Sequence, residues 1–415
     1  MKSRFSMGFW NYPCAGQLPA SEVKRWVRCG MTLTQSPFFS YETNKKEELL
    51  PLLDEAARQG IKIIVMISDL TYRKLLQIGE EAYRELFKKA YEDFGKHPAT
   101  YGFYVGDEPI GQEACDAAIR AIQIQKEMAP ELTPFANLHP YYRLCERRLY
   151  SGKTFQAWGD DFMKRSGTKV LCYDCYSQMG PDPDGIDNYF YNLNLFNELA
   201  KKHGAEPWIT LLSNNHFNYV VRGEEDFLWQ INTAVASGYR GIMWFFFYMS
   251  HSRNCYTKCP VNEFGEETET FRNLSYMVRR FHNMCSDLFF RLRHKKTYHV
   301  VRAYGGYEIF PGDTHKFIRQ VDSVHRLPAI ISFFEDEEGK EYVVLMNNSK
   351  TEAGSFALVL NEKVKKIIYV EENGKLEREF TQENNPLLHT FHTNKEGTFV
   401  GDWLTPGQMM IFRFE

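Results

Sequence analysis

The sequence predicts an α/β fold, in which a (β/α)8 TIM barrel over residues 1–295 is followed by a small all-β sandwich domain over residues 296–415. Eight strand-like segments alternate with helical segments in the first two thirds of the chain, which is the pattern of such a barrel. After about Lys296 the chain changes to short strands separated by turn residues, as in a sandwich. The length of 415 residues fits a barrel of about 250 residues with a smaller partner.

The strands of the predicted barrel are eight strand-like runs. In chain order they span residues 5–12, 31–39, 61–68, 101–108, 133–139, 169–177, 208–213 and 241–249. A doubly wound sheet is the main rival, and it would need a glycine-rich phosphate loop after its first strand to suggest a nucleotide site. The segment from Asn11 to Gly16 is not such a loop, so the barrel is favoured.

Capping and stop residues mark the helices between these strands. The first helix follows Ser21, a residue suited to an N-cap, and ends at Gly30. The second has Asn44 and Glu47 at capping-box-like spacing and ends at Gly60. The other helices are expected at about 79–94, 112–128, 154–165, 186–203, 224–237 and 266–292.

The C-terminal domain is expected to consist of hairpins. Runs at 330–334 and 342–346 flank a turn at 336–339, and runs at 366–370 and 375–380 flank Asn373-Gly374, a strong hairpin signal. A last strand is expected at 407–415. No motif stands out in this domain, so we expect it to stabilise the chain rather than to bind a ligand of its own.

Composition excludes several classes of function. The net charge of −3 gives no basic excess for nucleic-acid binding. The longest strongly apolar run, Ile242 to Met249, is far shorter than the roughly 20 residues that span a bilayer, so no membrane insertion is expected. No leader is visible at the N-terminus, which favours the cytoplasm, or the periplasm or exterior if a leader has been removed. The oligomeric state is left open.

Catalytic groups of barrel enzymes lie at the C-terminal ends of the strands, so the polar and aromatic residues there are the candidates. These are Trp10, Asn11, Tyr12, Asp69, Asp107, Glu108, Asn137, His139, Asp174, Tyr176, Asn214, Trp244 and Tyr248. Aromatic residues make up 15% of the chain, and several of these rings are expected at the same mouth as Asp107 and Glu108.

The fourth strand carries the most specific signal. The run from His97-Pro98 to Asp107-Glu108-Pro109 resembles barrel glycoside hydrolases, many of which have a His-Pro before this strand and a Glu-Pro at its end, preceded by Asn or Asp. The resemblance implies that Glu108 is the general acid that protonates the leaving sugar oxygen. Such an acid must be partly desolvated so that it keeps its proton near neutral pH.

The strand at 208–213 departs from that resemblance, because it ends without the second glutamate that many retaining barrel glycosidases use as nucleophile. Three explanations stay open. The Asp107-Glu108 pair resembles that of substrate-assisted β-N-acetylhexosaminidases, in which the acetamido oxygen of the substrate attacks, the Asp orients it, and a Tyr and a Trp shape the pocket. Asp174 could instead be the second carboxylate, or the protein could bind glycans without cleaving them.

The resemblance also gives Trp244 a role, since a Trp on the eighth strand of such barrels forms the floor under a sugar. The expected partner is an oligosaccharide or glycoconjugate. No cofactor or metal is expected: His251, Cys255 and Cys259 have four-residue spacing but lack a fourth ligand. A metal-dependent lyase would be the rival chemistry.

Overall fold

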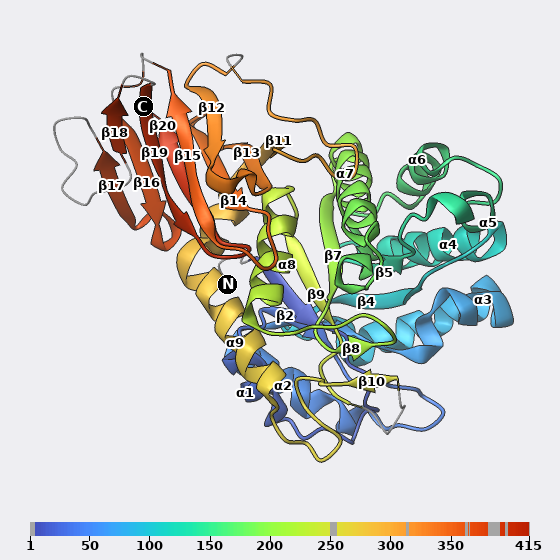
Figure 1. Cartoon of the computed structure of the whole chain (residues 1–415). Helices are drawn as coiled ribbons and strands as arrows, with labels where there is room; N and C mark the ends of the chain where they lie inside the picture. The colour runs from blue at the N-terminus through green and yellow to red at the C-terminus, as the bar shows by residue number, and fades with distance from the viewer. Residues whose placement is uncertain are drawn as a thin grey trace. The chain divides into compact units, whose positions relative to one another are not determined.

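A computed structural model describes residues 5–249, 255–312, 315–361, 364, 366–380, 391–394 and 397–414 (Figure 1). The chain divides into two compact units. The first contains residues 1–182, 195–220 and 240–275, and the second contains residues 183–194, 221–239 and 276–415. The boundary expected at 295/296 stays a prediction.

The first unit contains a parallel barrel sheet of eight strands within the described residues. Its hydrogen-bonded order is β1-β9-β7-β6-β5-β4-β3-β2. The strands are β1 (Ser6–Phe9), β2 (Leu33–Gln35), β3 (Lys62–Val65), β4 (Thr100–Asp107), β5 (Phe135–Leu138), β6 (Val170–Asp174), β7 (Glu206–Leu212) and β9 (Gly241–Phe245). All eight expected strands are confirmed.

The ring closes between β1 and β2. The backbone N–H of Thr32 donates to Met7 O at 2.8 Å, and a Cβ on Gly8 would lie only 1.9 Å from Leu33 O. A side chain at Gly8 would therefore force the two strands apart, so glycine is required at this seam.

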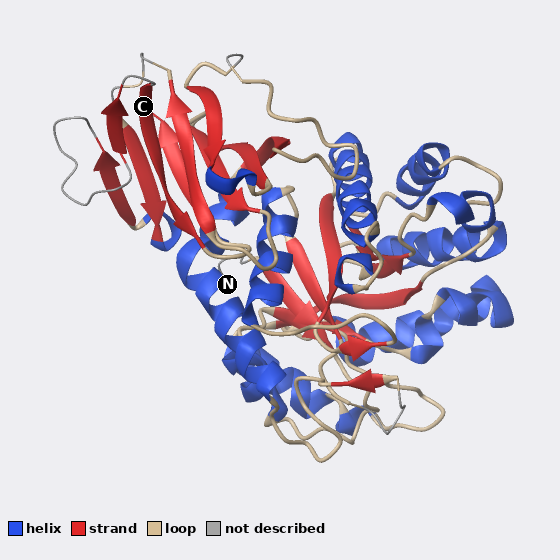
Figure 2. Ribbon diagram, viewed as in Figure 1, coloured by secondary structure: helices blue, strands red, loops and turns tan. Residues whose placement is uncertain are grey.

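Alternate residues of the strands fill the barrel interior. Leu33, Ile64, Phe135, Trp208 and Met243 pack there in one buried cluster. The opposite faces of the strands meet helices, and α3 and α4 pack against β4 and against each other (Figure 2). This is the layer arrangement of a TIM barrel.

The helices follow the strands in chain order. They are α1 (Glu22–Arg28), α2 (Leu50–Gln59), α3 (Tyr72–Ala90), α4 (Gln112–Met128), α5 (Glu146–Leu149), α6 (Phe155–Ser166), α7 (Gly185–His203), α8 (Glu224–Ala236), α9 (Glu269–Phe281) and α10 (Asp287–Arg291). One expected boundary was wrong. The third helix begins at Tyr72 because Thr71 Oγ1 caps it by accepting from Lys74 N, and Gly79 forms a kink inside it. The expected long last helix is continuous, because the π-helical turn His282–Ser286 joins α9 to α10.

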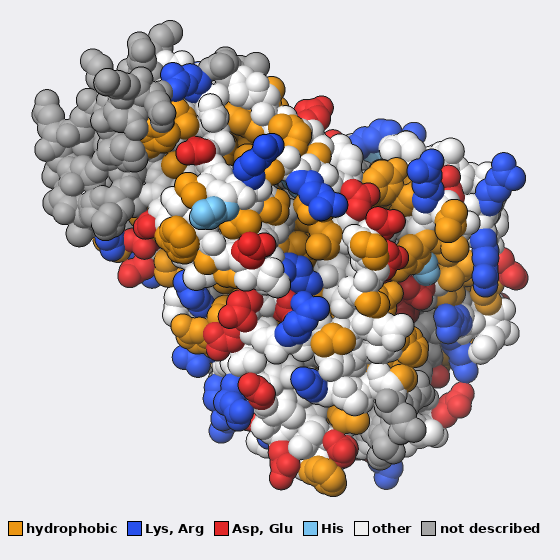
Figure 3. Space-filling view, in the orientation of Figure 1, with side chains coloured by type: hydrophobic (Ala, Val, Ile, Leu, Met, Phe, Trp, Pro, Cys, Tyr) orange, Lys and Arg blue, Asp and Glu red, His pale blue; other side chains and the backbone are white. Residues whose placement is uncertain are grey.

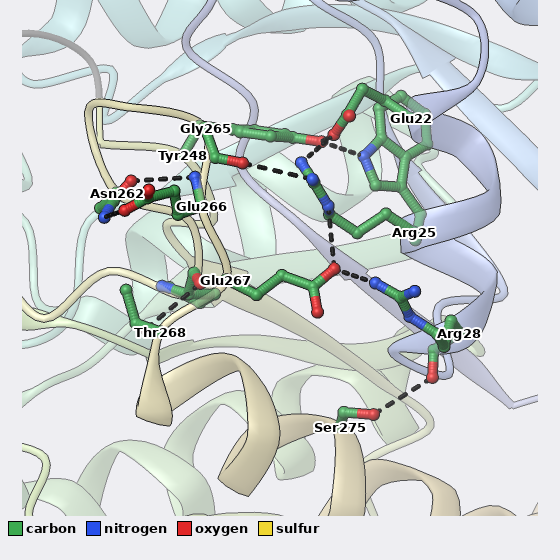
Figure 4. Close-up of polar contacts among 12 residues, drawn as sticks. Glu22, Arg25, Arg28, Tyr248, Asn262, Gly265, Glu266, Glu267, Thr268 and Ser275 are labelled. Carbon is green, nitrogen blue, oxygen red and sulfur yellow. Dashed lines mark hydrogen bonds and ion pairs between the residues drawn. The ribbon is translucent and has the colours of Figure 1, made fainter.

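The long loop after β9 is held against α1, as Figure 4 shows. Glu267 Oε1 accepts from Arg25 Nε at 3.1 Å and also from Arg28. Tyr248 Oη donates to Glu22 Oε2 at 2.7 Å. Residues more than 220 positions apart are thereby joined, which fixes the base of this loop.

The second unit contains two antiparallel sheets. One has the order β11-β13-β14-β20-β16-β17, and the other β12-β15-β19-β18. The strands are β11 (Arg293–Val300), β12 (Ile318–Ser323), β13 (Ala329–Glu335), β14 (Glu341–Asn347), β15 (Gly354–Leu360), β16 (Ile367–Glu371), β17 (Leu376–Phe380), β18 (Phe391–Asn394), β19 (Gly397–Leu404) and β20 (Met409–Phe414).

One apolar core joins these two sheets into a sandwich. Ile331 and Leu345 of the first sheet lie in the same buried cluster as Phe356, Leu358 and Val400 of the second. The two expected hairpins are present as β13–β14 and β16–β17. The sandwich architecture expected from the sequence is thus confirmed.

Charged side chains of both signs are interspersed on the face in Figure 3, in keeping with the net charge of −3. No helix in the described part of the chain is both long and apolar enough to cross a membrane.

Candidate active site

Three carboxyl groups gather at the C-terminal ends of two barrel strands. Asp107 is the last residue of β4, Glu108 follows it, and Asp174 is the last residue of β6. The side-chain amide of Asn137 on β5 donates to Asp107 Oδ1 (3.0 Å) and to Asp174 Oδ1 (2.8 Å). A carboxylate oxygen only accepts hydrogen bonds, so the amide nitrogen of Asn137 faces both acids.

A buried series of donors fixes the orientation of Asn137. Thr210 Oγ1 on β7 donates to Asn137 Oδ1 at 3.2 Å, and Trp10 Nε1 donates to Thr210 Oγ1 at 3.3 Å. All three residues are buried. Because a fully partnered buried network holds one arrangement, Trp10 acts on the site through Thr210 and Asn137.

A β-bulge in β4 turns Asp107 toward the barrel interior. Tyr104 pairs with Phe135 and Gly106 pairs with Ala136, so two residues along β4 correspond to one residue along β5. Asp107 is therefore paired with Asn137. The extra residue shifts the alternation of side chains by one position. Tyr104 and Asp107 therefore face the same side, whereas a regular strand would place residues three apart on opposite faces.

Glu108 lies in a strained backbone conformation. Its φ is +44°, its N–H donates to Asn137 O at 2.9 Å, and its side chain is 37% exposed. A positive φ on a residue with a Cβ costs on the order of 1 kcal/mol or more, and such strain concentrates at functional sites. Its Oε1 lies 3.8 Å from His139 Nε2.

The environment raises the pKa of all three acids. Burial, followed by the charge of Glu108, raises the pKa of Asp107 to about 6. Burial raises the pKa of Glu108 as well. The pKa of Asp174 is raised well above its ordinary value by burial and then by the charges of Glu108 and Asp107.

His139 is neutral at this position. Its Nδ1 lies 2.7 Å from Pro140 O, and because a carbonyl only accepts, Nδ1 carries the hydrogen. The other nitrogen is therefore an acceptor directed at Glu108. Burial lowers the pKa of His139, which keeps the ring neutral at neutral pH.

Tyrosine hydroxyls surround the acids. Burial, followed by the carboxylate charges, raises the pKa of Tyr12 and Tyr176 well above the ordinary value. The pKa of Tyr142 is raised by burial and further by Asp174 and Glu108. These hydroxyls thus remain protonated and can donate hydrogen bonds.

A further contact fixes the end of β4. Tyr72 Oη donates to Asp107 O at 3.1 Å and accepts from Arg73 Nε at 3.1 Å. The ring of Tyr72 lies against Gly106, where a Cβ would approach it to 2.3 Å. Gly106 therefore permits this tyrosine to support the backbone that carries the acids.

Two aromatic candidates are buried and directed to other partners, which does not fit the sugar-contacting role expected of them. Trp244 is 0% exposed, and its Nε1 points to Met7 Sδ at 3.2 Å. Successive strand residues point to opposite faces, so the β9 residue on the side of the acids is Phe245. Tyr248 is buried, with its hydroxyl between Trp26 Nε1 and Glu22.

Three polar candidates are also engaged elsewhere. Asp69 accepts from Ser40 Oγ and from Tyr41 N, so it shapes a loop. Asn11 is fully buried and donates to Gln35 O. Asn214 is buried and donates to the neighbouring Asn215 O. The structure thus brings together Asp107, Glu108, Asp174, Asn137, His139, Tyr12 and Tyr176, with Trp10 in support.

Sequence reasoning missed Thr210, Tyr142 and Phe245. Thr210 was missed because only residues at strand ends were considered as candidates. It lies in β7 two residues after the inward-facing Trp208, so alternation along the strand could have predicted that it also faces inward. Tyr142 lies in a loop, where no periodicity gives its direction. Among the described residues, no group of three or more His, Cys, Asp or Glu is arranged to hold a metal ion, and His251 lies outside those residues.

No protein-family model matches the chain, and no curated protein matches it. Solved structures do match. A family 39 glycoside hydrolase from Bacteroides cellulosilyticus superposes with a TM-score of 0.54 at 11% identity, covering 99% of this chain and 81% of that one. A β-galactosidase from Halorubrum lacusprofundi has a TM-score of 0.51 at 10% identity, covering 67% of this chain and 58% of that one.

A β-galactosidase from a psychrophilic Marinomonas has a TM-score of 0.50 at 12% identity, covering 66% of this chain. This chain spans only 59% of the length of that enzyme. At such identities the likeness concerns architecture. The chain has the barrel fold found in these glycosidases, and the coverage of the family 39 enzyme extends over the sandwich as well.

Proposed function

We propose that this protein is a glycoside hydrolase with Glu108 as its general acid. The observation that carries the proposal is the carboxyl cluster: Glu108 is partly exposed, has a raised pKa, and lies beside two further acids at the C-terminal end of the barrel. A raised pKa is what a general acid needs in order to hold a proton for the leaving oxygen in weakly acidic or neutral solution.

For the second group we propose substrate assistance on an N-acetylhexosaminide. Burial and the neighbouring carboxylate charges raise the pKa of Asp174 well above its ordinary value, and a protonated carboxyl is a poor nucleophile. This favours substrate assistance over Asp174 as the nucleophile. Asp107, held by Asn137, is then the group that orients the acetamido N–H, and a protonated hydroxyl of Tyr176 or Tyr12 donates to the acetamido oxygen.

The proposed reaction balances with these groups alone. The acetamido oxygen attacks the anomeric carbon, the glycosidic C–O bond breaks, and the proton of Glu108 passes to the departing oxygen. Water then attacks the anomeric carbon of the cyclic intermediate and gives its proton to the Glu108 carboxylate, which restores the acid.

The test is turnover of 4-methylumbelliferyl glycosides and the corresponding disaccharides, N-acetylhexosaminides included. Glu108→Gln should lower kcat/KM by about 10²–10⁴-fold. Glu113→Gln, an exposed acid at the start of α4, is the matched control and should keep full activity. A wild type that binds glycans but cleaves none would instead support the non-catalytic alternative.

Fluorination of the substrate acetamido group separates the two mechanisms. Each fluorine makes the carbonyl oxygen a poorer nucleophile, so substrate assistance predicts a steep fall in kcat/KM along the series. A rate that does not change with fluorination would favour the mechanism that uses Asp174.

A further inference from the structure

Two loops beyond the barrel strands form a small sheet at the mouth. β8 (Asn215–His216) follows β7 and pairs antiparallel with β10 (Tyr256–Thr257), which follows β9 (Figure 1). Beyond the paired residues, Phe217 N donates to Cys255 O at 3.1 Å. Backbone pairing thus holds the two loops together.

Three rings lie on this small sheet. His216 and Tyr256 stack with centroids 4.7 Å apart and planes 10° apart. Phe217 lies 4.1 Å from His216 and 6.4 Å from Tyr256. Phe217 is nevertheless 68% exposed. We name His216, Phe217 and Tyr256 the rim aromatic cluster.

The backbone holds Phe217 in a costly conformation. Its φ is +52°, a region in which a bulky side chain is rare. Neither burial of its ring nor local backbone preference accounts for a phenylalanine here, since polar Asn or Gly would suit both the exposure and the φ. Strain retained at an exposed aromatic residue points to a role in binding.

Ring contacts connect this cluster to the acids. His216 lies 5.3 Å from Phe245 and 6.3 Å from Tyr176, and Phe245 stacks on Tyr176 at 5.4 Å. After burial, the charges of Asp174, Asp107 and Glu108 raise the pKa of Tyr176 and that of Tyr12. The aromatic surface therefore runs without a break from the carboxyl cluster outward to Phe217.

We propose that the rim aromatic cluster binds the saccharide unit that adjoins the reacting sugar, with the face of Phe217 against the C–H face of that unit. The inference rests on the proposed function, and it specifies a substrate of at least two sugar units. A flat apolar ring suits the C–H face of a pyranose, while the hydroxyls stay in water or reach polar neighbours. Continuity with the acids favours this occupant over a protein partner.

The test measures equilibrium binding to Glu108→Gln, which should cleave the ligand at least about a hundredfold more slowly than wild type. The probes are N-acetylglucosamine and N-acetylgalactosamine, each free and as the non-reducing end of a β-linked trisaccharide. One trisaccharide should bind at least about fivefold more tightly than its monosaccharide, the size of one aromatic contact. A second substitution, Phe217→Asn, introduces a residue that tolerates the positive φ. It should reduce that difference in affinity to less than about twofold.

Phe264→Asn is the matched control, because Phe264 is 78% exposed in a turn of the same loop as Tyr256. It should keep the full difference, and Tyr256→Leu should lose most of it while a thermal melt confirms folding. The proposal fails if neither trisaccharide binds more tightly than its monosaccharide, or if Phe217→Asn and Tyr256→Leu keep the difference. Turnover of aryl glycosides by the wild type tests the proposed function separately, so either idea can fail alone.

Discussion

The sandwich core buries apolar side chains, whereas the carboxyl cluster of the barrel holds ionisable ones close together. Apolar side chains of both sheets fill the sandwich core, and a nearby buried amide, Asn347, donates to three carbonyl oxygens at 2.8–3.2 Å. The barrel instead holds three acids together, each with a raised pKa. The sandwich arrangement contributes stability, whereas the cluster gives up stability to keep reactive groups in place.

The largest effect is expected in the sandwich. Phe356→Ala removes a fully buried ring between the two sheets and should lower the free energy of unfolding by about 3–5 kcal/mol. Denaturant titration measures it. Trp403→Ala, an exposed aromatic residue of β19 in the same sheet, is the control and should cost far less. Equal losses for the two variants would contradict the view of this domain as a packed core.

A substitution in the carboxyl cluster should instead increase the stability of the fold. The raised pKa of Asp107 means that its stabilising contribution is present at low pH and is lost as pH rises from about 4 through about 6. At pH 7, Asp107→Asn should therefore stabilise the fold by up to about 3 kcal/mol while activity falls. Unfolding measured between pH 4 and pH 8 should show a smaller decrease in the variant. A variant less stable than wild type at pH 7 would refute this account.

The next largest effect is expected from loss of Asn137, which positions Asp107 and Asp174. Asn137→Leu removes the amide shared by Asp107 and Asp174 without changing the volume greatly. Loss of these hydrogen bonds should lower kcat/KM by about 10–100-fold. Because the bonds lower the pKa of both acids, the pH profile of the residual activity should move to higher pH. An unshifted profile would mean that Asn137 has only a packing role.

The smallest effect is a shift in one titration. The Glu108 charge helps to raise the pKa of Asp107, second to burial. In Glu108→Gln that pKa should move down from about 6 toward the ordinary value without reaching it, because burial remains. A carbon-13 NMR titration of the aspartate carboxyls can follow it. An unchanged value would show that the two charges do not interact.

Much of the fold followed from local pattern. Eight strand-like runs and two hairpin signals were enough to predict the barrel and the sandwich, because alternation and turn residues are local properties. The grouping of Asp107, Asn137 and Asp174 followed from the rule that barrel sites lie at strand ends.

What failed depended on the direction of side chains and on contacts distant in sequence. Trp244 was placed at the mouth because its strand ends there, but period-two alternation puts Phe245 on that side. The bulge that turns Asp107 inward was missed because it depends on the register of β4 against β5, although Gly106 inside the strand is a local sign of it. The rim aromatic cluster depends on pairing between β8 and β10, some 40 residues apart.

The closure of the barrel has a consequence for synthesis of the chain. β1 pairs with β9, so the partner of Ser6, Gly241, is synthesised much later than Ser6 itself. The other neighbour of β1 is the short β2. At roughly 5–20 residues per second, an emerging chain exposes one edge of its first strand for about 12–50 seconds. An apolar strand edge is a template for pairing with other chains. The first strand is therefore open to such pairing until β9 has been synthesised.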